Sequence, residues 1–409
     1  MDRASRGARL ALSLAAAGAA LGAGEAGLRL LAPQATGPAW FDHDPELGAV
    51  PVPGQRGVRR GRDGHRFSFT HDPEGRRVVP GAAGLGSARC LLVVGDSFTY
   101  GQGVHDAKTW CSVMQEDLRR ARPPTRVVNA GNPGKGTDYA LKLLLARGRA
   151  LAPERVLLAF FKNDFGDNER GAYFTVTADA IEERTSLDRG PLLARWPGYS
   201  WLLSRSHLAN LLREAALRAG ADRGRGGPAW SVDGDGGPRA PVYVTPARQE
   251  LARRYLEALA GAAAALGAPL TVAYLPDRRD AWLARRGRPP SPDEAAFREI
   301  ARSLDLDVLS LTPILAAADL PLERLYLGDG HWTPAAHTLA ARALLDAVRR
   351  EDPLPEGAEG QRGRGAPDTT PAPIRLAGSR RSPCARHGGS VPPPPRTSPA
   401  RAAPSRSRS

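Results

Sequence analysis

The first candidate for chemistry is Ser97, in the segment LLVVGDSFTYGQG at residues 91–103. Four apolar residues without alternation begin this segment, as in a parallel strand buried on both faces. Gly95 allows a sharp turn, and residues 107–121 then have the pattern of a helix. A strand, a tight turn and a helix place a serine hydroxyl at the carboxyl edge of an α/β sheet, where ligands bind. A serine is a poor nucleophile at neutral pH, so this interpretation requires a base.

His331 is the best candidate for that base. It lies in the last loop before the final helix, and in a doubly wound sheet that loop can lie beside the loop of Ser97. Asp329 stands two residues earlier and could orient the imidazole or stabilise its charge. The chain order Ser, Asp, His is one of several that give the same triad geometry. The alternative is a histidine that only caps a turn or packs beside Trp332.

A serine that attacks an ester builds negative charge on the carbonyl oxygen, and donors must stabilise that charge. We expect three donors, namely the backbone N–H of Ser97, the backbone N–H of Gly134 and the side-chain amide of Asn163. Each such donor is worth ~3 kcal/mol in the transition state. A simpler interpretation stays open for two of them, because Gly134 could only supply a positive φ and Asn163 could only cap a turn.

The alternation of short apolar segments with helical ones predicts the fold that must position these residues. We expect strands at residues 91–94, 126–130, 155–161, 270–274 and 308–311, and helices at 107–121, 139–150, 196–217, 246–266, 292–303 and after His331. Strands followed by polar loops and helices favour parallel strands joined by right-handed crossovers, which is an α/β fold.

Composition divides the chain into four parts. In residues 1–33, three arginines precede a fifteen-residue uncharged run at 10–24, the pattern of a signal peptide or signal anchor, although the run is shorter than the ~20 residues that span a bilayer. Residues 34–88 are interpreted as an irregular, strand-bearing extension. Residues 89–350 form the main domain, with an insertion at 169–245 that could cap the site and that includes a glycine-rich loop at 220–237. The tail at 351–409, rich in Arg, Pro and Ser, is expected to be disordered.

Most of the positive charge lies in that tail. The formal net charge is +14, and residues 361–409 contribute ten arginines against one aspartate, or +9. The tail lacks aromatic residues for stacking on bases, so we expect a solvated segment and no nucleic-acid partner. The three cysteines, Cys90, Cys111 and Cys384, have no metal-like spacing, and we expect the first two to be buried free thiols.

No cofactor or metal is expected. Residues 129–136 are similar in spacing to a phosphate-binding loop but have Asn129 and Gly136 where that motif needs glycine and Ser or Thr. His331 and His337 are six residues apart, which does not give a metal pair on one helix face. An acidic loop is expected at Asp164, Asp167 and Asn168; it could hold a cation or orient a substrate, but we favour a solvated turn.

Taken together, four blocks resemble the SGNH or GDSL hydrolase superfamily. They are GDSFTYGQGV, NAGNPGKGT, KND and DGHW, and the resemblance runs from about residue 90 to 348 with gaps across the insertion. It implies a flavodoxin-like, doubly wound sheet of five parallel strands in three α/β/α layers, and an esterase-type activity. It also implies Ser97 as nucleophile, His331 as base, and Ser97, Gly134 and Asn163 as the oxyanion donors.

Two departures from the family pattern are visible. The glycine that usually stands two residues before Asn163 is Phe161 here, which we expect only to alter packing. The Asp of the usual DxxH block would fall on Gly328, whereas Asp329 stands two residues before His331. This DxHW form resembles a branch that contains polysaccharide O-acetyltransferases, and the export-like N-terminus followed by a strand-bearing extension resembles the same extracytoplasmic branch.

These observations give three functional hypotheses. The first is a serine esterase outside the cytoplasm, secreted or anchored by residues 1–33, that acts on a small ester or an acylated glycan, with an acetyl ester favoured. The second keeps the acyl-enzyme but transfers the acyl group to a glycan hydroxyl. The third is a non-catalytic glycan-binding protein with a relict site.

Overall fold

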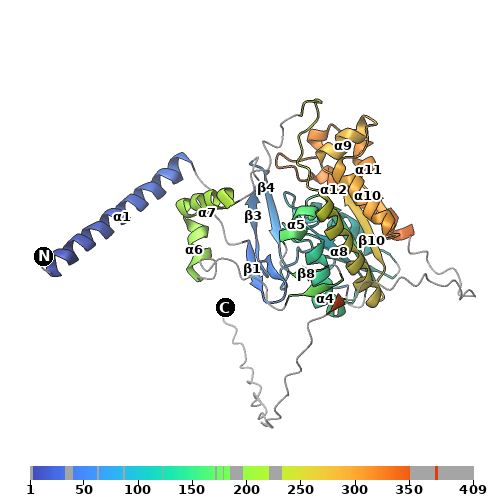
Figure 1. Ribbon diagram of the computed structural model, residues 1–409, viewed down its shortest axis with the longest axis horizontal. Coiled ribbons are helices and arrows are strands. Elements are labelled where there is room, and N and C mark those ends of the chain that lie inside the picture. Colours follow the sequence, from blue (N-terminus) through green and yellow to red (C-terminus); the bar gives the residue numbers. More distant parts are fainter. Residues whose placement is uncertain are drawn as a thin grey trace, which may run out of the picture.

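A parallel sheet of five strands forms the centre of the computed structural model (Figure 1). The structure describes residues 3–32, 40–61, 64–85, 88–121, 123–170, 173–177, 179–184, 197–220, 233–350 and 374–375. In spatial order the strands are β11 (Val308–Ser310), β10 (Leu270–Leu275), β7 (Arg155–Phe161), β5 (Arg89–Gly95) and β6 (Thr125–Asn129), all parallel. The chain starts at β5, adds β6 on one side, and then adds β7, β10 and β11 on the other. The predicted doubly wound fold is confirmed, and ligands bind such sheets where the winding direction reverses, between β5 and β7.

Successive side chains of the central strands enter two different cores. Leu92 and Val94 of β5 belong to a core beneath α4 (Thr137–Leu151), α8 (Pro246–Ala265) and α10 (Pro292–Ser303). Leu91 and Val93 belong to the opposite core, beneath α3 (Trp110–Leu118) and α12 (Pro334–Arg350). Because a strand projects its side chains to alternate faces, an uninterrupted apolar strand requires helices on both sides. The sheet is therefore the middle of three layers.

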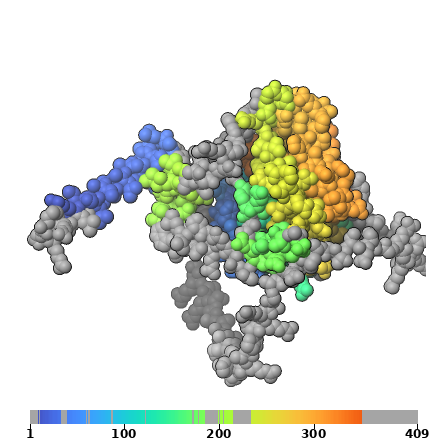
Figure 2. Space-filling model, viewed as in Figure 1, coloured from blue at the N-terminus to red at the C-terminus, as the bar shows by residue number. Residues whose placement is uncertain are grey.

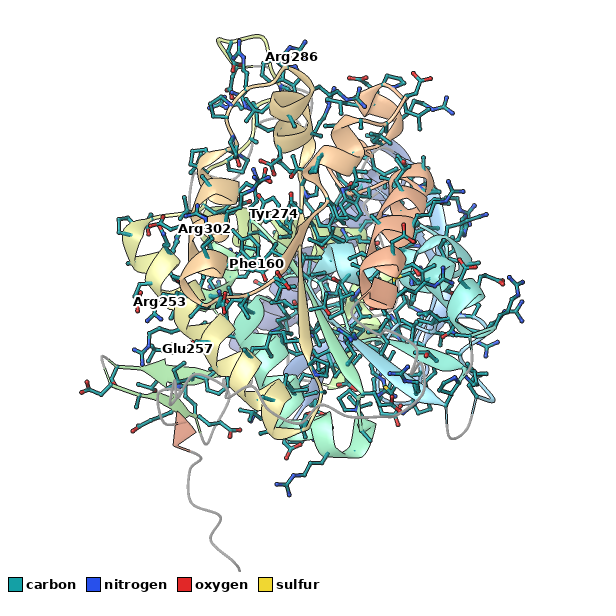
Figure 3. All side chains as sticks on the ribbon, turned by 90° about the vertical axis from the view of Figure 1, so that its right-hand side faces the viewer. Phe160, Arg253, Glu257, Tyr274, Arg286 and Arg302 are labelled. Atoms are coloured by element: carbon teal, nitrogen blue, oxygen red, sulfur yellow. The ribbon has the colours of Figure 1, made fainter. Side chains whose placement is uncertain are left out.

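Figure 3 shows the division between core and surface on one side of the sheet. Phe160 on β7 and Tyr274 on β10 are fully buried beneath the helices. Arg253 and Glu257 lie on the outer face of α8, where their side chains form an ion pair of 3.2 Å at spacing i, i+4. The helix therefore turns its charged stripe to the solvent and its apolar stripe to the sheet.

The expected helix at 107–121 is shorter than predicted. Asp106–Lys108 form a 3₁₀ turn (η1), and α3 begins only at Trp110 and ends at Leu118. The physical reason is the cap at Thr109, whose side chain accepts a hydrogen bond of 3.2 Å from the Ser112 N–H and so marks the helix start.

The predicted acidic loop at residues 164–168 is wrong. These residues form α5 (Asp164–Arg170), a two-turn helix with acidic residues in its first turn. Negative charge at that end of a helix interacts favourably with the helix dipole. Two further helices were also missed, α9 (Arg278–Arg285) and α11 (Thr312–Ala316). α9 starts with a capping box in which Asp277 and Asp280 each accept a hydrogen bond from the other's backbone N–H.

Two small antiparallel sheets precede the main sheet, in the region expected to be a strand-bearing extension. β1 (Phe41–Asp44) pairs with β2 (Gly48–Pro51), and β3 (Arg56–Arg60) pairs with β4 (Arg66–Thr70). Phe67 and Phe69 of β4 are buried, so this hairpin has its own apolar face against the body of the protein.

The region expected as an insertion, residues 169–245, is described only in part. β8 (Phe174–Val176) and β9 (Ile181–Glu183) form an antiparallel pair, and β12 (Ile374–Arg375) joins β9 in parallel. α6 (Pro197–Arg205) and α7 (His207–Gly220) follow, and α7 packs on α1 (Arg3–Leu31). Residues 221–232 of the expected glycine-rich loop lie outside the described residues, as does the tail at 351–409 apart from β12. The cap over the site and the disordered tail stay predictions.

α1 is longer than the uncharged run at 10–24. Ala11–Leu31, a stretch of 21 residues, is long and apolar enough to cross a membrane, and its composition is compatible with a signal peptide or an anchor. The helix continues because Glu25 and Arg29, which end the uncharged run, form an i, i+4 ion pair of 2.9 Å. Cys90 and Cys111 are buried free thiols, as predicted, and Cys384 lies outside the described residues.

Gly95, the last residue of β5, occupies a position that cannot hold a side chain. Its φ is +152°, and a Cβ there would lie 2.3 Å from the Oγ1 of Thr99 and 2.7 Å from the carbonyl oxygen of Ala159 on β7. The turn from β5 into α2 (Ser97–Tyr100) therefore depends on the absence of that side chain.

We expect Gly95→Ala to lower the free energy of unfolding by about 2–4 kcal/mol, because the methyl group overpacks the turn and strains the backbone. Denaturant unfolding followed by circular dichroism measures this loss. Gly84→Ala is the matched control: Gly84 has φ +81° but no atom within 4 Å of an added Cβ. It should lose only about 1 kcal/mol of backbone strain. Equal losses in the two variants would contradict the importance of the close approach at Gly95.

Candidate active site

Ser97 is the first residue of α2 and lies directly after β5. Asp96 caps this helix, because its side chain accepts a hydrogen bond of 2.8 Å from the Phe98 N–H. Only 9 % of Ser97 is exposed, so its hydroxyl is largely shielded from bulk water. The sharp turn at Gly95 and the cap at Asp96 together fix the direction in which the hydroxyl points.

The Nε2 atom of His331 lies 2.9 Å from the Oγ atom of Ser97. This is the contact that a general base needs in order to take the proton of an attacking hydroxyl. The ring of Phe98 lies 5.0 Å from the imidazole, centroid to centroid, and so limits its movement. The structure therefore brings together the two residues that the sequence places at opposite ends of the domain.

The loop that carries His331 is held on both sides by hydrogen bonds. The Leu327 N–H donates to the carbonyl oxygen of His331 at 2.7 Å, and Tyr326 pairs with Trp332 as an isolated antiparallel bridge. The buried indole N–H of Trp332 donates to the carbonyl oxygen of Pro276, at the end of β10, at 3.2 Å. The loop is thus attached to the sheet edge, and Trp332 has the packing role while His331 faces Ser97.

Asp329 lies behind the imidazole, but it is not in line with the ring N–H. The Oδ1 atom of Asp329 is 3.1 Å from the Nδ1 atom of His331, yet Nδ1 has no properly directed hydrogen bond. The same oxygen accepts a hydrogen bond of 3.1 Å from the His331 backbone N–H. Burial opposes ionisation of Asp329, but the contact with the His331 side chain, the charge of that side chain and the hydrogen bond from the His331 N–H together hold the pKa of Asp329 below its usual value. Asp329 thus lies where its charge could stabilise a positively charged imidazole, without a directed bond to Nδ1.

Two of the three predicted oxyanion donors are the N–H of Ser97 itself and the side-chain amide of Asn163. The Ser97 N–H belongs to the first turn of α2, where backbone N–H groups have no acceptor within the helix. Asn163 follows β7, the neighbour of β5. Its side chain is close enough to Asp96 to act against the burial that raises the pKa of this residue, and so to favour the ionised form. Its amide nitrogen donates to the Oδ2 of Asp167 at 2.9 Å, so an oxyanion would have to compete with Asp167 for this donor.

Gly134, the third predicted donor, lies in a tight turn beside β5. The Lys135 N–H donates to the carbonyl oxygen of Asn132 at 3.2 Å, and Gly134 has φ +77°, as position i+2 of a type II turn requires. The simpler interpretation of this glycine therefore accounts for its presence. The loop does begin at the site, because the Asn132 N–H donates to the carbonyl oxygen of Gly95 at 2.9 Å. An oxyanion role for Gly134 stays a prediction.

Two buried carboxyl groups lie close to Ser97. Burial raises the pKa of Asp96, against the hydrogen bond from the Phe98 N–H. Burial also raises the pKa of Asp164 well above its usual range, and the charge of Asp96 adds to this effect. The Thr137 hydroxyl donates to Asp164 at 3.2 Å. Ionisation of both groups would place two adjacent carboxylates near Ser97, which the raised pKa of Asp164 disfavours.

Phe161, at the position where the family pattern has glycine, packs beside the site. Its ring stacks on Phe98 with a centroid distance of 4.0 Å, and Phe98 also contacts the rings of His331 and Trp332 at 5.0 and 5.4 Å. The rings of Phe98 and Phe161 therefore fill space beside His331, and a glycine at position 161 would leave part of that space open.

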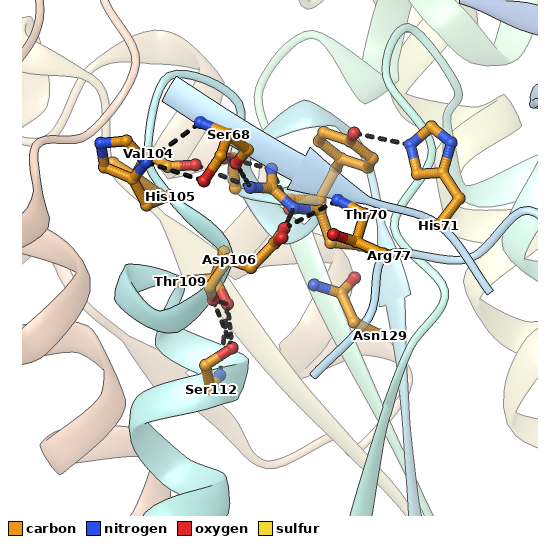
Figure 4. Close-up of polar contacts among 12 residues, drawn as sticks. Ser68, Thr70, His71, Arg77, Val104, His105, Asp106, Thr109, Ser112 and Asn129 are labelled. Atoms are coloured by element: carbon orange, nitrogen blue, oxygen red, sulfur yellow. Dashed lines mark hydrogen bonds and ion pairs between the residues drawn. The ribbon is translucent and has the colours of Figure 1, made fainter. Parts of the chain in front are cut away.

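Arg77, which was not predicted as a site residue, is a buried residue of the N-terminal extension that supports the segment after Ser97 (Figure 4). Its guanidinium donates to the carbonyl oxygens of Gly101 at 2.9 Å and Val104 at 2.7 Å. It also pairs with Asp106 at 2.7 Å and donates to the carbonyl oxygen of Ser68 at 3.1 Å. A positive charge at the carboxyl end of α2 satisfies carbonyl groups that the helix leaves open.

Two histidines of the extension reach the same segment. His71 forms a hydrogen bond of 2.8 Å with the hydroxyl of Tyr100, the last residue of α2 (Figure 4). His65 forms one of 3.0 Å with the carbonyl oxygen of Gly103. The extension therefore contributes directly to the surroundings of Ser97.

We expect Arg77→Gln to lower the free energy of unfolding by about 3 kcal/mol, because it leaves Asp106 and several carbonyl groups without a cation. Denaturant unfolding measures the loss. Arg76→Gln is the matched control at the next position, since Arg76 forms ion pairs at the surface with Asp72 (2.7 Å) and Glu74 (2.8 Å). It should lose less than about 1 kcal/mol. A similar loss in both variants would contradict the anchoring role of Arg77.

We expect Asp329→Asn to lower kcat, but by less than the ~10⁴-fold that is lost when the aspartate of a serine-protease triad becomes asparagine, and by less than the loss caused by removing Ser97 or His331. Asn can still accept the hydrogen bond from the His331 N–H, so the variant removes the charge and keeps the loop. Steady-state kinetics on an activated acetyl ester measures the effect, and Asp329→Ala, which removes both, should lose more. A loss as large as that of Ser97→Ala would show that Asp329 does more than stabilise the imidazolium.

Comparison with known proteins identifies the family. The family model of the GDSL-like lipase/acylhydrolase family matches residues 93–339, which is more than half of the chain. No curated protein matches the sequence. Among solved structures, TesA is 17 % identical and covers 64 % of this chain and 99 % of its own, with a TM-score of 0.37.

Two further structures show similar values. The psychrotrophic esterase EstA from Pseudoalteromonas sp. is 14 % identical and covers 64 % of this chain and 98 % of its own, with a TM-score of 0.36. A two-domain esterase active on acetylated mannans is 13 % identical and covers 68 % of this chain and 54 % of its own, with a TM-score of 0.37. Because the family model matches more than half of its length, the chain belongs to the GDSL-like lipase/acylhydrolase family.

Proposed function

We propose that the protein is a serine esterase that hydrolyses small carboxylic esters through an acyl-enzyme on Ser97. The observation that carries this proposal is the distance of 2.9 Å between the Nε2 of His331 and the Oγ of Ser97, with the carboxylate of Asp329 behind the ring. Acyl transfer requires a nucleophile, a base in contact with it, and a carboxylate that stabilises the base once it is protonated.

In the proposed reaction, the Ser97 oxygen attacks the ester carbonyl carbon while His331 takes the hydroxyl proton. The charge on the former carbonyl oxygen is stabilised by the Ser97 N–H and by the amide of Asn163, with Gly134 as a further donor. The tetrahedral intermediate then collapses, the C–O bond to the alcohol breaks, and His331 returns the proton to the leaving alcohol. A water molecule, activated by the same imidazole, releases the acid and regenerates Ser97.

We infer that the acyl group is short, with acetyl as the favoured case. The support is the stack of Phe98 and Phe161, which fills the space beside His331 where the family pattern has a glycine. Acyl pockets discriminate by volume, so large rings next to the nucleophile disfavour long chains. The DxHW block, which resembles that of polysaccharide O-acetyltransferases, favours a carbohydrate as the alcohol portion.

We further propose that α1 anchors the protein in a membrane. It offers 21 residues of suitable length and composition, and three arginines, at positions 3, 6 and 9, precede its apolar part. Positive residues flanking a membrane helix stay on the cytoplasmic side. The catalytic domain would then lie outside the cytoplasm, where acylated glycans are accessible to it.

We expect Ser97→Ala and His331→Ala each to lower the hydrolysis of p-nitrophenyl acetate by a factor of at least about 10³. His43→Ala, a change at an exposed histidine, serves as the control and should leave the rate unchanged. Covalent labelling by a fluorophosphonate should be lost in Ser97→Ala. Hydrolysis that survives in Ser97→Ala would contradict the proposal.

The same assay separates the finer parts of the proposal. Acetyl esters should react faster than octanoyl esters, and the opposite order would contradict the short acyl pocket. If the protein is a hydrolase, acetate is released in the presence of an added oligosaccharide and the oligosaccharide stays unmodified. Acetylated oligosaccharide formed at the expense of acetate would instead identify the protein as an acyltransferase.

A further inference from the structure

Helix α1 and the consecutive helices α6 and α7, from two distant parts of the sequence, form one unit beside the body of the protein. α1, α6 and α7 lie together on one side, away from α9, α10, α11 and α12 (Figures 1 and 2). The link between them is Glu25 of α1, whose carboxylate accepts hydrogen bonds of 2.9 Å from the backbone N–H groups of His207 and Leu208 and from the hydroxyl of Ser206. An acidic side chain at the first N–H groups of a helix is a favourable cap, so Glu25 holds the start of α7.

Arg29, one turn further along α1, strengthens the same link. It pairs with Glu25 at 2.9 Å and donates to the carbonyl oxygen of Arg205, the last residue of α6, at 2.9 Å. Glu25 and Arg29 interrupt an otherwise apolar helix, and both are used to bind the α6–α7 pair. Glu25 and Arg29 therefore hold the carboxyl end of α1 against the end of α6 and the beginning of α7.

α7 carries an apolar stripe that continues from this link. Leu208, Leu211, Leu212 and Ala215 follow the spacing i, i+3, i+4, i+7, which places them on one face of the helix. Leu208 begins the stripe against α1, where its Cδ2 lies 3.9 Å from the Cβ position of Gly24. Leu211 and Leu212 are 36 % and 60 % exposed. The apolar surface thus extends from α1 along α7.

Asn210 and Arg213 lie on the face of α7 opposite the stripe. The Asn210 side chain donates to the carbonyl oxygens of Leu203 and Ser206 and so joins α7 to α6. Arg213 lies near Arg59 on β3, where its repulsion adds to burial in lowering the pKa of Arg59 to about 10. The face opposite the stripe is therefore polar, with Asn210 bonded to α6 and its end and Arg213 exposed.

α6 adds an aromatic and a basic residue to the exposed surface. Trp201 is 58 % exposed, and the guanidinium of Arg205 lies over its ring at 5.1 Å. Between residues 197 and 220 the sequence has three arginines and one glutamate. Tryptophan and arginine beside exposed leucines are typical of helices that lie in the interface of a membrane, where apolar parts enter the lipid and charged groups stay at the headgroups.

We propose that α6 and α7 lie on the surface of the membrane in which α1 is anchored, with the stripe Leu208–Leu211–Leu212–Ala215 and Trp201 in contact with lipid. The inference rests on the proposed anchoring by α1. Continuity favours lipid over a second copy of the chain, because the stripe begins against α1 and α1 itself enters the bilayer. The expected insertion then contains a second membrane contact, which holds the catalytic domain close to the bilayer.

The test uses the full chain with Cys384→Ser, so that the remaining native cysteines, Cys90 and Cys111, are buried and do not label. Leu212→Cys carries an environment-sensitive NBD fluorophore, and Arg213→Cys, on the opposite face, is the matched control. Each protein is reconstituted into vesicles of phosphatidylcholine and phosphatidylglycerol. We expect a blue-shifted, brighter signal at position 212 that a quencher attached to lipid reduces, and a solvent-like signal at position 213.

Flotation of the same vesicles separates this inference from the anchor. Protein that floats with the vesicles while the label at position 212 stays solvent-like would overturn the contact of α7 and leave the anchor intact. Protein that does not float would overturn the anchor and, with it, the inference. A blue shift at position 212 that needs no vesicles and rises with protein concentration would show that a second copy covers the stripe, which also overturns the inference.

Discussion

The contact between the Oγ of Ser97 and the Nε2 of His331 is the interaction on which the rest of the site depends. The two residues are 234 positions apart, and no local preference of the chain can bring them together. The parallel sheet does so, because the segments beyond the carboxyl ends of its strands meet at one edge, where Trp332 attaches the loop of His331 to Pro276 after β10. Each loop is then fixed separately, the first by the turn at Gly95 and the second by the bridge between Tyr326 and Trp332. The geometry is therefore a property of rigid elements.

Buried polar groups outside the reacting residues stabilise this arrangement. An unpaired charge is costly in the interior, so Arg77 is stable there only with Asp106 and the carbonyl oxygens around it. Arg77 lies before residue 93, where the match to the family model begins. The segment that follows the nucleophile is thus held by a part of the chain that the family pattern does not include, which gives the N-terminal extension a structural role.

The features that could be predicted from the sequence are those that produce a pattern among neighbouring residues. The five strands were found because each is a short apolar run, and Ser97, Asn163 and His331 because each follows a strand end or precedes a helix. Arg77 was not found, since its carbonyl partners on the nucleophile loop lie 24 and 27 residues away. α5 was missed because its acidic first turn was interpreted as a loop. The hydrogen bond from Asn163 to Asp167 was missed for the same reason, although the two residues have the spacing i, i+4 in the sequence.

The most direct test of the central claim is to trap the acyl-enzyme during turnover and to locate it by mass spectrometry of the digested protein. The account predicts that rapid acid quenching of a reaction with an acetyl ester yields an acetyl group on the peptide that contains Ser97, and that His331→Ala abolishes it. Turnover of the ester with acetyl on another residue, or with no covalent intermediate in the wild-type protein, would contradict the account.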